Sequence, residues 1–356
     1  MIARNSSFTY KGRTVDVKQV ARELGVRYVL EGSVRKGGNK VRITGQLIDT
    51  ASGAHIWADR FDGALDDIFE LQDQVASGVV GAIEPKLRSA EIERAIRKPT
   101  ENLGAYDLYL RALAQFWRWT PDDWRESISL LRQALEIDPS YGPAAGLFAW
   151  CRVLQIGRRG LSEEEIGEGV RFALQAIETG SEDPDTLWMG GWGMLMLAGE
   201  HAAGLSAMGR SLTLNPNSAL ALCFFGWGQS YRRQSQRAIE ALERAMRLSP
   251  LDPQPWLFHG ALAHAHFAAG RYEETIEWAD RALHAQPRMI AVLGVKAAAC
   301  GHLCRIDEGR ECARRYAELC QWSTVGTAQT GWGRFMSPDF LATFVDGLRK
   351  AGLPEG

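Results

Sequence analysis

The chain has 356 residues, of which 46% are hydrophobic and 24% charged, and its formal net charge is −2. This length predicts two domains, the composition is that of an ordinary folded chain, and the small net charge argues against binding to nucleic acid or an anionic membrane. The sequence has no apolar run of about 18 residues that could span a membrane and no apolar signal core at its start. Its 6 cysteines do not predict a disulfide framework, so we expect a cytoplasmic protein with reduced thiols.

The first hundred residues have the pattern of a small α/β domain. Apolar residues at helical spacing predict a short helix over residues 17–25. β-branched and aromatic residues, partly in alternation, then predict strands over residues 27–35, 41–44 and 55–58. Turn-forming residues separate the strands at 37–39 and 52–53. Helical spacing returns over residues 65–97, with a kink or break expected at Pro85.

The rest of the chain predicts a series of helical hairpins. They cover residues 106–119 with 123–137, 142–155 with 163–179, three hairpins ending at Pro216, Pro250 and Pro287, and 290–304 with 307–320. The second hairpin has an unusually long loop, residues 157–165. Residues 323–336 are rich in Gly and Thr and predict a loop. Ser337 and Pro338 are a helix start, and the helix to Lys350 is expected to cover the open end of the array.

The clearest hairpin, residues 256–287, resembles the tetratricopeptide repeat. The matching residues are Leu262, Ala263, Phe267, Gly270, Tyr272, Ala282 and Pro287. It departs from the family pattern at His259 and Thr275. Further partial copies include Gly226, Ala238, Ala245 and Pro250; Trp188, Gly199, Leu205 and Pro216; and Ala134, Leu135 and Pro139. Four copies in near-register predict stacked hairpins that bury one continuous core.

Residues 1–98 resemble the TolB amino-terminal-like domain that precedes repeat arrays in bacterial signalling proteins. The resemblance is carried by residues 17–25, 28–34 and 57–62. The family pattern has a further strand and helix, and most of a second strand, before Ile2, so we expect a truncated domain. In relatives of this kind the missing part follows either a class III adenylyl or guanylyl cyclase domain or a winged-helix DNA-binding domain. The block from Ala3 to Gly12 is more similar to the cyclase-linked group.

No constellation in the sequence predicts catalysis, a metal or a cofactor. Cys300, Cys304, Cys312 and Cys320 lack the tight spacing of zinc sites. The histidines between 259 and 302 lack the HExxH spacing. The acidic residues from Asp59 to Asp67 have no phosphate-binding glycine loop beside them and are typical of a helix start.

By the repeat resemblance, inward positions on the first helix of each hairpin line a concave groove. Carried over residue by residue, they are Tyr109, Phe116, Trp119, Trp150, Met189, Met196, Trp227, Tyr231, His264 and Phe267. For each residue alone, packing between hairpins is the favoured interpretation. As a set they predict an apolar groove that holds a peptide or a helix of a protein partner.

The sequence therefore predicts an α+β chain. It would consist of a truncated TolB amino-terminal-like domain at 1–98, an all-α solenoid of tetratricopeptide-like hairpins at 99–322, and a loop with a capping helix at 323–356. The predicted function is a non-catalytic interaction scaffold in bacterial signalling. One alternative makes the chain the regulatory portion of a class III cyclase, and a second makes it the sensor portion of a winged-helix regulator. The partner and the oligomeric state are not predicted.

Overall fold

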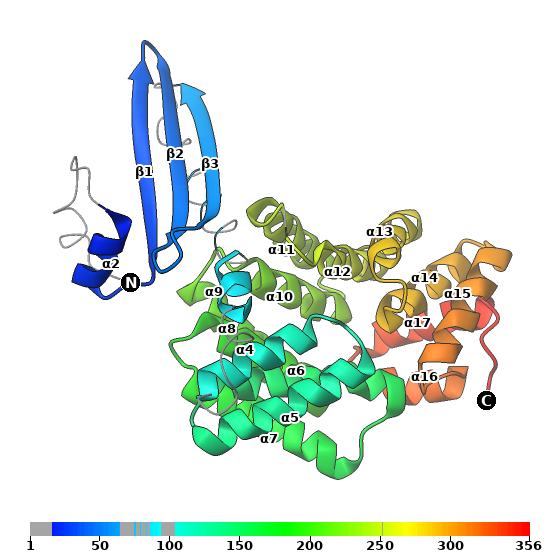
Figure 1. Cartoon of the computed structure of the whole chain (residues 1–356). Helices are drawn as coiled ribbons and strands as arrows, with labels where there is room; N and C mark the ends of the chain where they lie inside the picture. Colours follow the sequence, from blue (N-terminus) through cyan, green and yellow to red (C-terminus); the bar gives the residue numbers. More distant parts are fainter. Residues whose placement is uncertain are drawn as a thin grey trace. The chain divides into compact units, whose positions relative to one another are not determined.

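The computed structural model describes residues 16–64, 75, 79, 83, 86–93, 104–250 and 252–356. It divides into two compact units, residues 1–91 and residues 92–356. We call them the sheet unit and the helical unit, and Figure 1 shows the elements of both.

The sheet unit contains an antiparallel sheet with the strand order β1-β2-β3. Its strands are β1, Tyr28–Gly37, β2, Lys40–Asp49, and β3, His55–Ala64. Helix α2, Val17–Leu24, starts at Asp16, whose side chain accepts a hydrogen bond from the Lys18 amide, and stops at Gly25, where φ is 63°. The predicted helix, the three strands and the two turns are confirmed. Most of residues 65–97, including Pro85, lies outside the described residues, but the described stretch 86–93 is helical.

The register gives the sheet one apolar face and one polar face. Leu30, Leu47 and Trp57 lie opposite one another, and Val34, Ile43 and Phe61 form the next row. Such cross-strand rows are the stabilising units of a sheet. Hydrogen-bonded polar pairs line the other face; they are Ser33 with Thr44, Gln46 with Glu31, and Arg42 with Asp62.

The helical unit consists of six hairpins in its described part, so the predicted tetratricopeptide-like solenoid is confirmed. The first helices are α4, Ala105–Phe116, α6, Gly142–Arg159, α8, Pro184–Gly193, α10, Ala219–Tyr231, α12, Pro255–Ala268, and α14, Ile290–His302. Their partners are α5, Pro121–Ile137, α7, Glu163–Thr179, α9, His201–Leu214, α11, Ser235–Leu248, α13, Tyr272–Ala285, and α15, Ile306–Leu319. A π-helical turn, η2, Met194–Ala198, extends α8. Helix α6 continues through residues 157–159, which the sequence had placed in a loop.

Small residues lie at close contacts between helices of the helical unit. Ala134, Ala176, Ala245 and Ala282 are fully buried on the second helices. Each also accepts the amide hydrogen bond of the residue that caps its helix. A larger side chain at these positions would push the helices apart, because protein interiors are close-packed.

The turn between the two helices of a hairpin needs a left-handed residue. Gly199 and Gly270 supply it with φ of 71° and 73°, whereas Trp119, Arg233 and Cys304 adopt φ of 62°, 56° and 57°. Only glycine takes this conformation without a steric penalty. The three turns at Trp119, Arg233 and Cys304 therefore carry backbone strain, because their left-handed residue is not glycine.

Two further helices follow the last hairpin, within what we call the C-terminal segment, residues 321–353. Helix α16 spans Val325–Trp332, so the prediction of a loop over residues 323–336 is wrong. The Thr324 side chain caps this helix, although Gly and Thr dominate its composition. Helix α17 spans Pro338–Lys350 with Ser337 as its cap, as predicted.

Helix α17 packs closely on α14 through glycines. A Cβ atom at Gly301 would lie 2.1 Å from the Gly347 carbonyl oxygen, and one at Gly347 would lie 2.5 Å from the Ala298 carbonyl oxygen. No larger residue fits at either position without moving a helix. The His302 ring also forms a 2.8 Å hydrogen bond to the Thr343 carbonyl.

Candidate functional site

The inner face of the helical unit is the side of the first helices on which the predicted groove residues meet the C-terminal segment. Nine of the ten predicted residues are buried, with exposed fractions between 0% for Phe116 and 8% for Trp119. Tyr109 is half-buried and packs edge-on against Tyr141 at 5.7 Å between ring centroids. Met189 packs against Gly146 of the neighbouring hairpin. The predicted set thus lies in the interior of the unit rather than on an open groove.

Aromatic rings connect the hairpins along this face. Trp188 stacks on Phe224 with centroids 4.7 Å apart and an interplanar angle of 6°. Trp150 meets both rings edge-on, at 5.0 and 4.9 Å, and Phe116 packs on Trp150 at 4.4 Å. Such pairs are stabilised beyond simple burial, so the inner face is a rigid aromatic layer.

The C-terminal segment covers the inner face of the later hairpins. Phe340 packs against Tyr231 at 5.7 Å and against Phe267 at 5.4 Å. Phe335 also meets Tyr231, at 6.0 Å, and the Ser337 amide donates a 2.9 Å hydrogen bond to the Tyr231 carbonyl. These contacts account for the burial of the predicted anchors Tyr231 and Phe267.

Contacts between distant hairpins close the array on itself. Trp119 of the first hairpin packs on Trp256 of the fifth at 4.4 Å. The amide of Gln321 donates a 2.9 Å hydrogen bond to the Gly157 carbonyl, and its side chain donates to the Ile156 carbonyl. The end of α6 therefore contacts the C-terminal segment. A regular, open repeat array would not bring these two parts of the chain together.

The closed array forms a partly open apolar cavity of about 100 Å³. Five predicted residues line it, namely Trp119, Trp150, Met196, Trp227 and Tyr231. Its opposite wall includes Trp322, Trp332 and Phe335 of the C-terminal segment. The structure thus brings half of the predicted set around one interior space.

Burial sets the charge state of the titratable groups on this face. It lowers the pKa of His264 to about 4, against a weak opposing effect of its hydrogen bond to the Gly260 carbonyl, so this ring is neutral at physiological pH. Burial likewise raises the pKa of Tyr231. Neither group is poised for proton transfer near pH 7.

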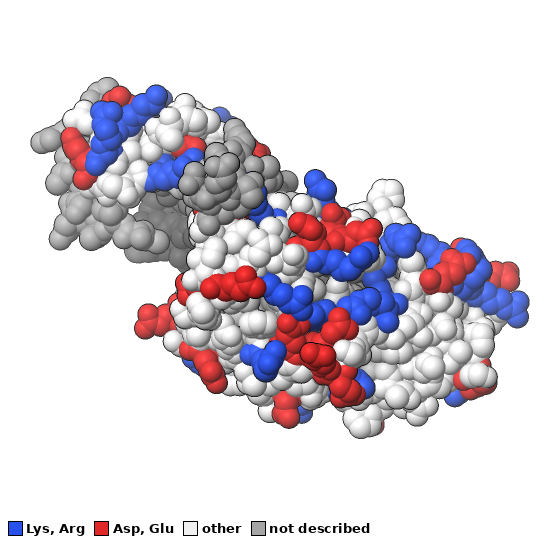
Figure 2. Space-filling view, turned by 60° about the horizontal axis from the view of Figure 1, so that its bottom comes forward, with Lys and Arg blue, Asp and Glu red and all other residues white. Residues whose placement is uncertain are grey.

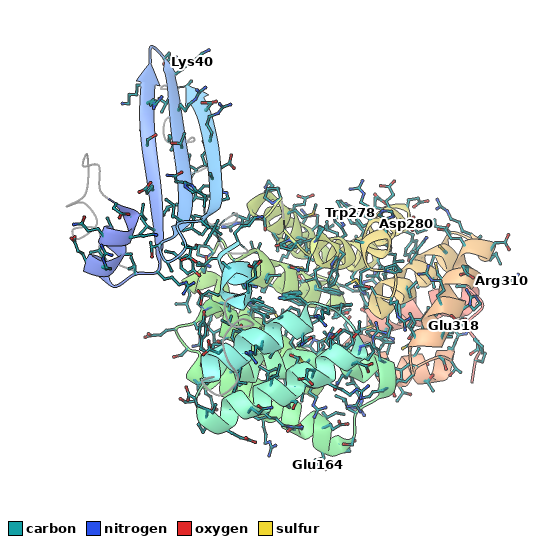
Figure 3. The ribbon with its side chains drawn as sticks, in the orientation of Figure 1. Lys40, Glu164, Trp278, Asp280, Arg310 and Glu318 are labelled. Carbon is teal, nitrogen blue, oxygen red and sulfur yellow. The ribbon has the colours of Figure 1, made fainter. Side chains whose placement is uncertain are left out.

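The part of the chain that the structure describes contains no group of three His, Cys, Asp or Glu residues placed to hold a metal ion. No helix in that part is long and apolar enough to cross a membrane. On the face seen in Figure 2, acidic and basic side chains of the helical unit are interspersed. In Figure 3, Glu164, Arg310 and Glu318 point outward from second helices of the hairpins. The chemistry available on the inner face is therefore apolar binding.

Several inner-face residues were missed by sequence reasoning. Trp192 and Phe224 belong to the aromatic layer, and Phe335, Phe340 and Phe344 come from outside the predicted repeats. The four-residue spacing of Phe340 and Phe344 is the one signal that could have revealed an apolar stripe on α17.

Comparison with known proteins supports the fold. No family model matches the chain. The chain is 39% identical over 186 residues to "Putative adenylate cyclase 3" of Rhizobium meliloti (strain 1021), a match that covers 52% of this chain and 32% of that protein. It is 29% identical over 92 residues to "Small glutamine-rich tetratricopeptide repeat-containing protein 2" of Mycosarcoma maydis, covering 26% of this chain and 25% of that one. The chain therefore spans a third or less of the length of these relatives.

Solved structures share the fold of the helical unit. A structure described as "Human IFIT1 dimer with m7Gppp-AAAA" aligns with a TM-score of 0.50 at 12% identity, covering 71% of this chain and 60% of that one. The Cut9 and Hcn1 structure from the APC/C aligns with a TM-score of 0.48 at 15% identity, over 76% of this chain and 47% of that one. The helical unit has a tetratricopeptide-like fold.

Proposed function

We propose that this chain is a non-catalytic, regulatory part of a bacterial signalling protein, and that it acts by binding a helical segment of a protein partner. The observation that carries the proposal is that the inner face already holds an amphipathic helix, α17, of its own chain. Phe340 and Phe344 lie four residues apart on this helix, and both pack on Phe267. Insertion of an apolar helix face into a groove is a recurring mode of peptide recognition.

In this proposal α17 occupies the site that a partner helix would take. The contacts of Tyr231 and Phe267 with α17 are the ones that a partner would replace. The predicted role of the ten groove residues then requires displacement of the C-terminal segment. We further propose the domain limits 1–98, 99–322 and 323–356, with a TolB amino-terminal-like fold for the first.

The similarity to "Putative adenylate cyclase 3" of Rhizobium meliloti supports a role beside an adenylate cyclase domain, which the resemblance of residues 1–98 would place in class III. We propose that the catalytic step belongs to such a domain and that this chain regulates it. The in-frame coding sequence upstream of Met1 tests this proposal directly. A cyclase domain there is the expected result, and a winged-helix domain would contradict it in favour of transcriptional regulation.

A peptide-binding experiment tests the groove itself. Gly347→Val should lift α17 from α14, since even a Cβ atom there would lie 2.5 Å from the Ala298 carbonyl oxygen. The array side of the contact stays intact in this variant. A fluorescently labelled peptide of residues 337–353 should then bind the variant and not the wild-type chain, as measured by fluorescence anisotropy.

Gly209→Ala is the matched control, because a Cβ atom at Gly209 meets nothing within 4 Å. It should exclude the peptide as the wild type does. A second control is the same peptide with both phenylalanines replaced by alanine, which should not bind the Gly347→Val chain. A folded Gly347→Val chain that fails to bind the native peptide would contradict the groove proposal.

A further inference from the structure

The cavity within the array has a strongly apolar wall and a volume of about 100 Å³, and it is partly open to solvent. Its walls come from separate hairpins and from the C-terminal segment, including Trp124, Trp150, Trp192, Trp227 and Trp332. A purely apolar engineered cavity of about 150 Å³ stays dry and binds benzene. The smaller volume here, its open side and the flat indole walls therefore limit the ligand to a single small ring whose polar group lies at the opening.

One end of this cavity carries positive charge that is not balanced by an acid. Arg158 lines the cavity, and it donates a 2.6 Å hydrogen bond to the Arg288 carbonyl oxygen. Among the described residues, no carboxylate pairs with Arg158; the cationic Arg288 acts on it after burial, and Cys320 has a smaller, opposing effect. Burial, reinforced by that cation, lowers the pKa of Arg158 to about 10. The guanidinium has five N–H donors, so one backbone carbonyl leaves it with spare capacity.

Two further features add positive potential at the same end. Helix α14 starts at Ile290, which lines the cavity together with Ala291, and the first turn of a helix carries unpaired amides and a partial positive charge. The Arg158 guanidinium lies over the Trp124 ring at 5.3 Å from its centroid. The Trp124 indole nitrogen is buried and has no hydrogen-bond partner, although buried polar groups are normally satisfied.

We propose that this cavity is a binding site for a small apolar carboxylate, with its ring among the tryptophans and its carboxylate on Arg158. The side chains at the charged end, the Arg158 guanidinium and the nearby Trp124 indole, are donors, and the Arg288 carbonyl oxygen, the recorded acceptor there, is already bound to Arg158. A ligand there must accept hydrogen bonds. A carboxylate matches a guanidinium with two parallel hydrogen bonds. A cationic ligand would meet Arg158 and Arg288 without a counter-charge and is excluded.

This site goes beyond the proposed helix-binding groove and does not depend on it. Its occupant would contact Arg158 from the second hairpin, Ala291 from the sixth, and Phe335 from the C-terminal segment. A bound ligand would therefore stabilise the closed array, because anything that binds the folded state alone raises the melting temperature.

Benzoate and benzamide are a matched pair of probes for this proposal, since they differ mainly in charge. Isothermal titration of the purified full chain should show one benzoate site, and benzoate should raise the melting temperature. The affinity for benzamide should be about tenfold lower or weaker, the typical effect of losing a charge-assisted hydrogen bond. Absence of benzoate binding, or equal affinity for the two probes, would overturn the proposal.

Variants locate the binding in the cavity. Arg158→Gln should reduce the benzoate affinity to that of benzamide, whereas Arg158→Lys should keep part of the preference for the acid. Arg171→Gln is the charge-matched control on the exposed surface of α7 and should leave the preference unchanged. If Arg158→Gln melts like the wild type and still prefers benzoate, the assignment to Arg158 is wrong.

A cavity-filling variant gives a second, independent test. Ala291→Phe should fill the space, abolish binding of both probes, and leave the melting temperature equal to or above that of the wild type. A folded Ala291→Phe chain that binds benzoate normally would place the site elsewhere and overturn the proposal.

Discussion

The sheet unit and the helical unit differ in how far their internal side-chain contacts are exposed to solvent. Side-chain pairs on the polar face of the sheet are solvent-exposed; Arg42 and Asp62 retain 51% and 47% exposure. On its apolar face, Leu30 and Val34 remain 54% and 60% exposed. In the helical unit, most aromatic rings are buried between elements, and so is the ion-paired Arg152, whose side chain is 5% exposed, although surface pairs such as Arg314 with Glu311 remain exposed. The same residue types should therefore contribute much more to stability in the helical unit.

Trp227→Ala should produce the largest effect. Trp227 is 5% exposed and contacts Trp192 and His264. Its truncation should cost roughly 3–5 kcal/mol of unfolding free energy, measured by urea unfolding followed by far-ultraviolet circular dichroism. Leu30→Ala in the sheet unit is the comparison and should cost no more than about 0.5 kcal/mol. An unchanged midpoint for Trp227→Ala would mean that this ring lies on an open groove.

Arg152→Ala should have the next largest effect. Arg152 binds Glu165 at 2.9 Å and Glu168 at 2.7 Å. Removing one partner of a buried ion pair costs about 3 kcal/mol or more, since the remaining charges lose their compensation. Arg42→Ala breaks an exposed pair and should cost at most about 1 kcal/mol. Equal losses in the two variants, measured by thermal melts, would refute the contrast between the units.

The acid sensitivity of the helical unit should depend on Glu165. Hydrogen bonding to Arg159, with Arg152 and the Ser162 amide, lowers the pKa of Glu165 to about 2, against the effect of burial. The pKa is lower in the folded state than the unfolded value of about 4.3. The ionised Glu165 carboxylate therefore stabilises the folded state fully above about pH 4.3, and this stabilisation is lost as the pH falls toward 2.

Glu165→Gln should accordingly flatten the loss of stability between about pH 4.3 and 2. The effect should be on the order of 1 kcal/mol after allowance for solvent screening. Melting temperatures measured across this range provide the test. Glu178→Gln, at an exposed site on the same helix, is the control and should retain the wild-type slope.

Cys304→Gly should produce the smallest change, and a favourable one. Cys304 is exposed and adopts φ of 57° at a hairpin turn. Glycine relieves the strain at the cost of a more flexible unfolded chain, so we expect a gain of about 0.5 kcal/mol. Gly270→Ala at the equivalent turn should lose about 1 kcal/mol, because φ is 73° although a Cβ atom there would meet nothing. Shifts of the same sign in the two thermal melts would contradict this explanation.

Much of the secondary structure follows from local patterns. The alternation over residues 41–44 and the glycine turns define the strands, and the helix start at Ser337 and Pro338 lies where predicted. These signals are readable because they depend on neighbours in sequence. Helix α16 was missed because it is rich in Gly and Thr, and a tertiary contact stabilises it: the Trp332 indole nitrogen donates a 2.8 Å hydrogen bond to the Tyr316 hydroxyl of α15.

The candidate site could be predicted only in part. Resemblance to the repeat pattern placed Trp227, Tyr231 and Phe267 on one face, and the structure agrees that they share an interior. The repeat pattern could not reveal that Phe335 and Phe340 also lie in that interior. Residues separated by about a hundred positions in the chain produce no local periodicity when they contact one another.

Local patterns were sufficient to predict the hairpins, the three strands and the turns between the strands, since each depends on repeat spacing or a nearby turn. They could not predict that the array closes on itself through Trp119 and Trp256, because these residues meet only in the folded chain. Likewise, nothing in the residues around Arg158 indicates that it faces a cavity without a carboxylate partner. The closure of the array and the charge balance around Arg158 both depend on residues that are far apart in sequence. These residues come into contact only when the chain folds.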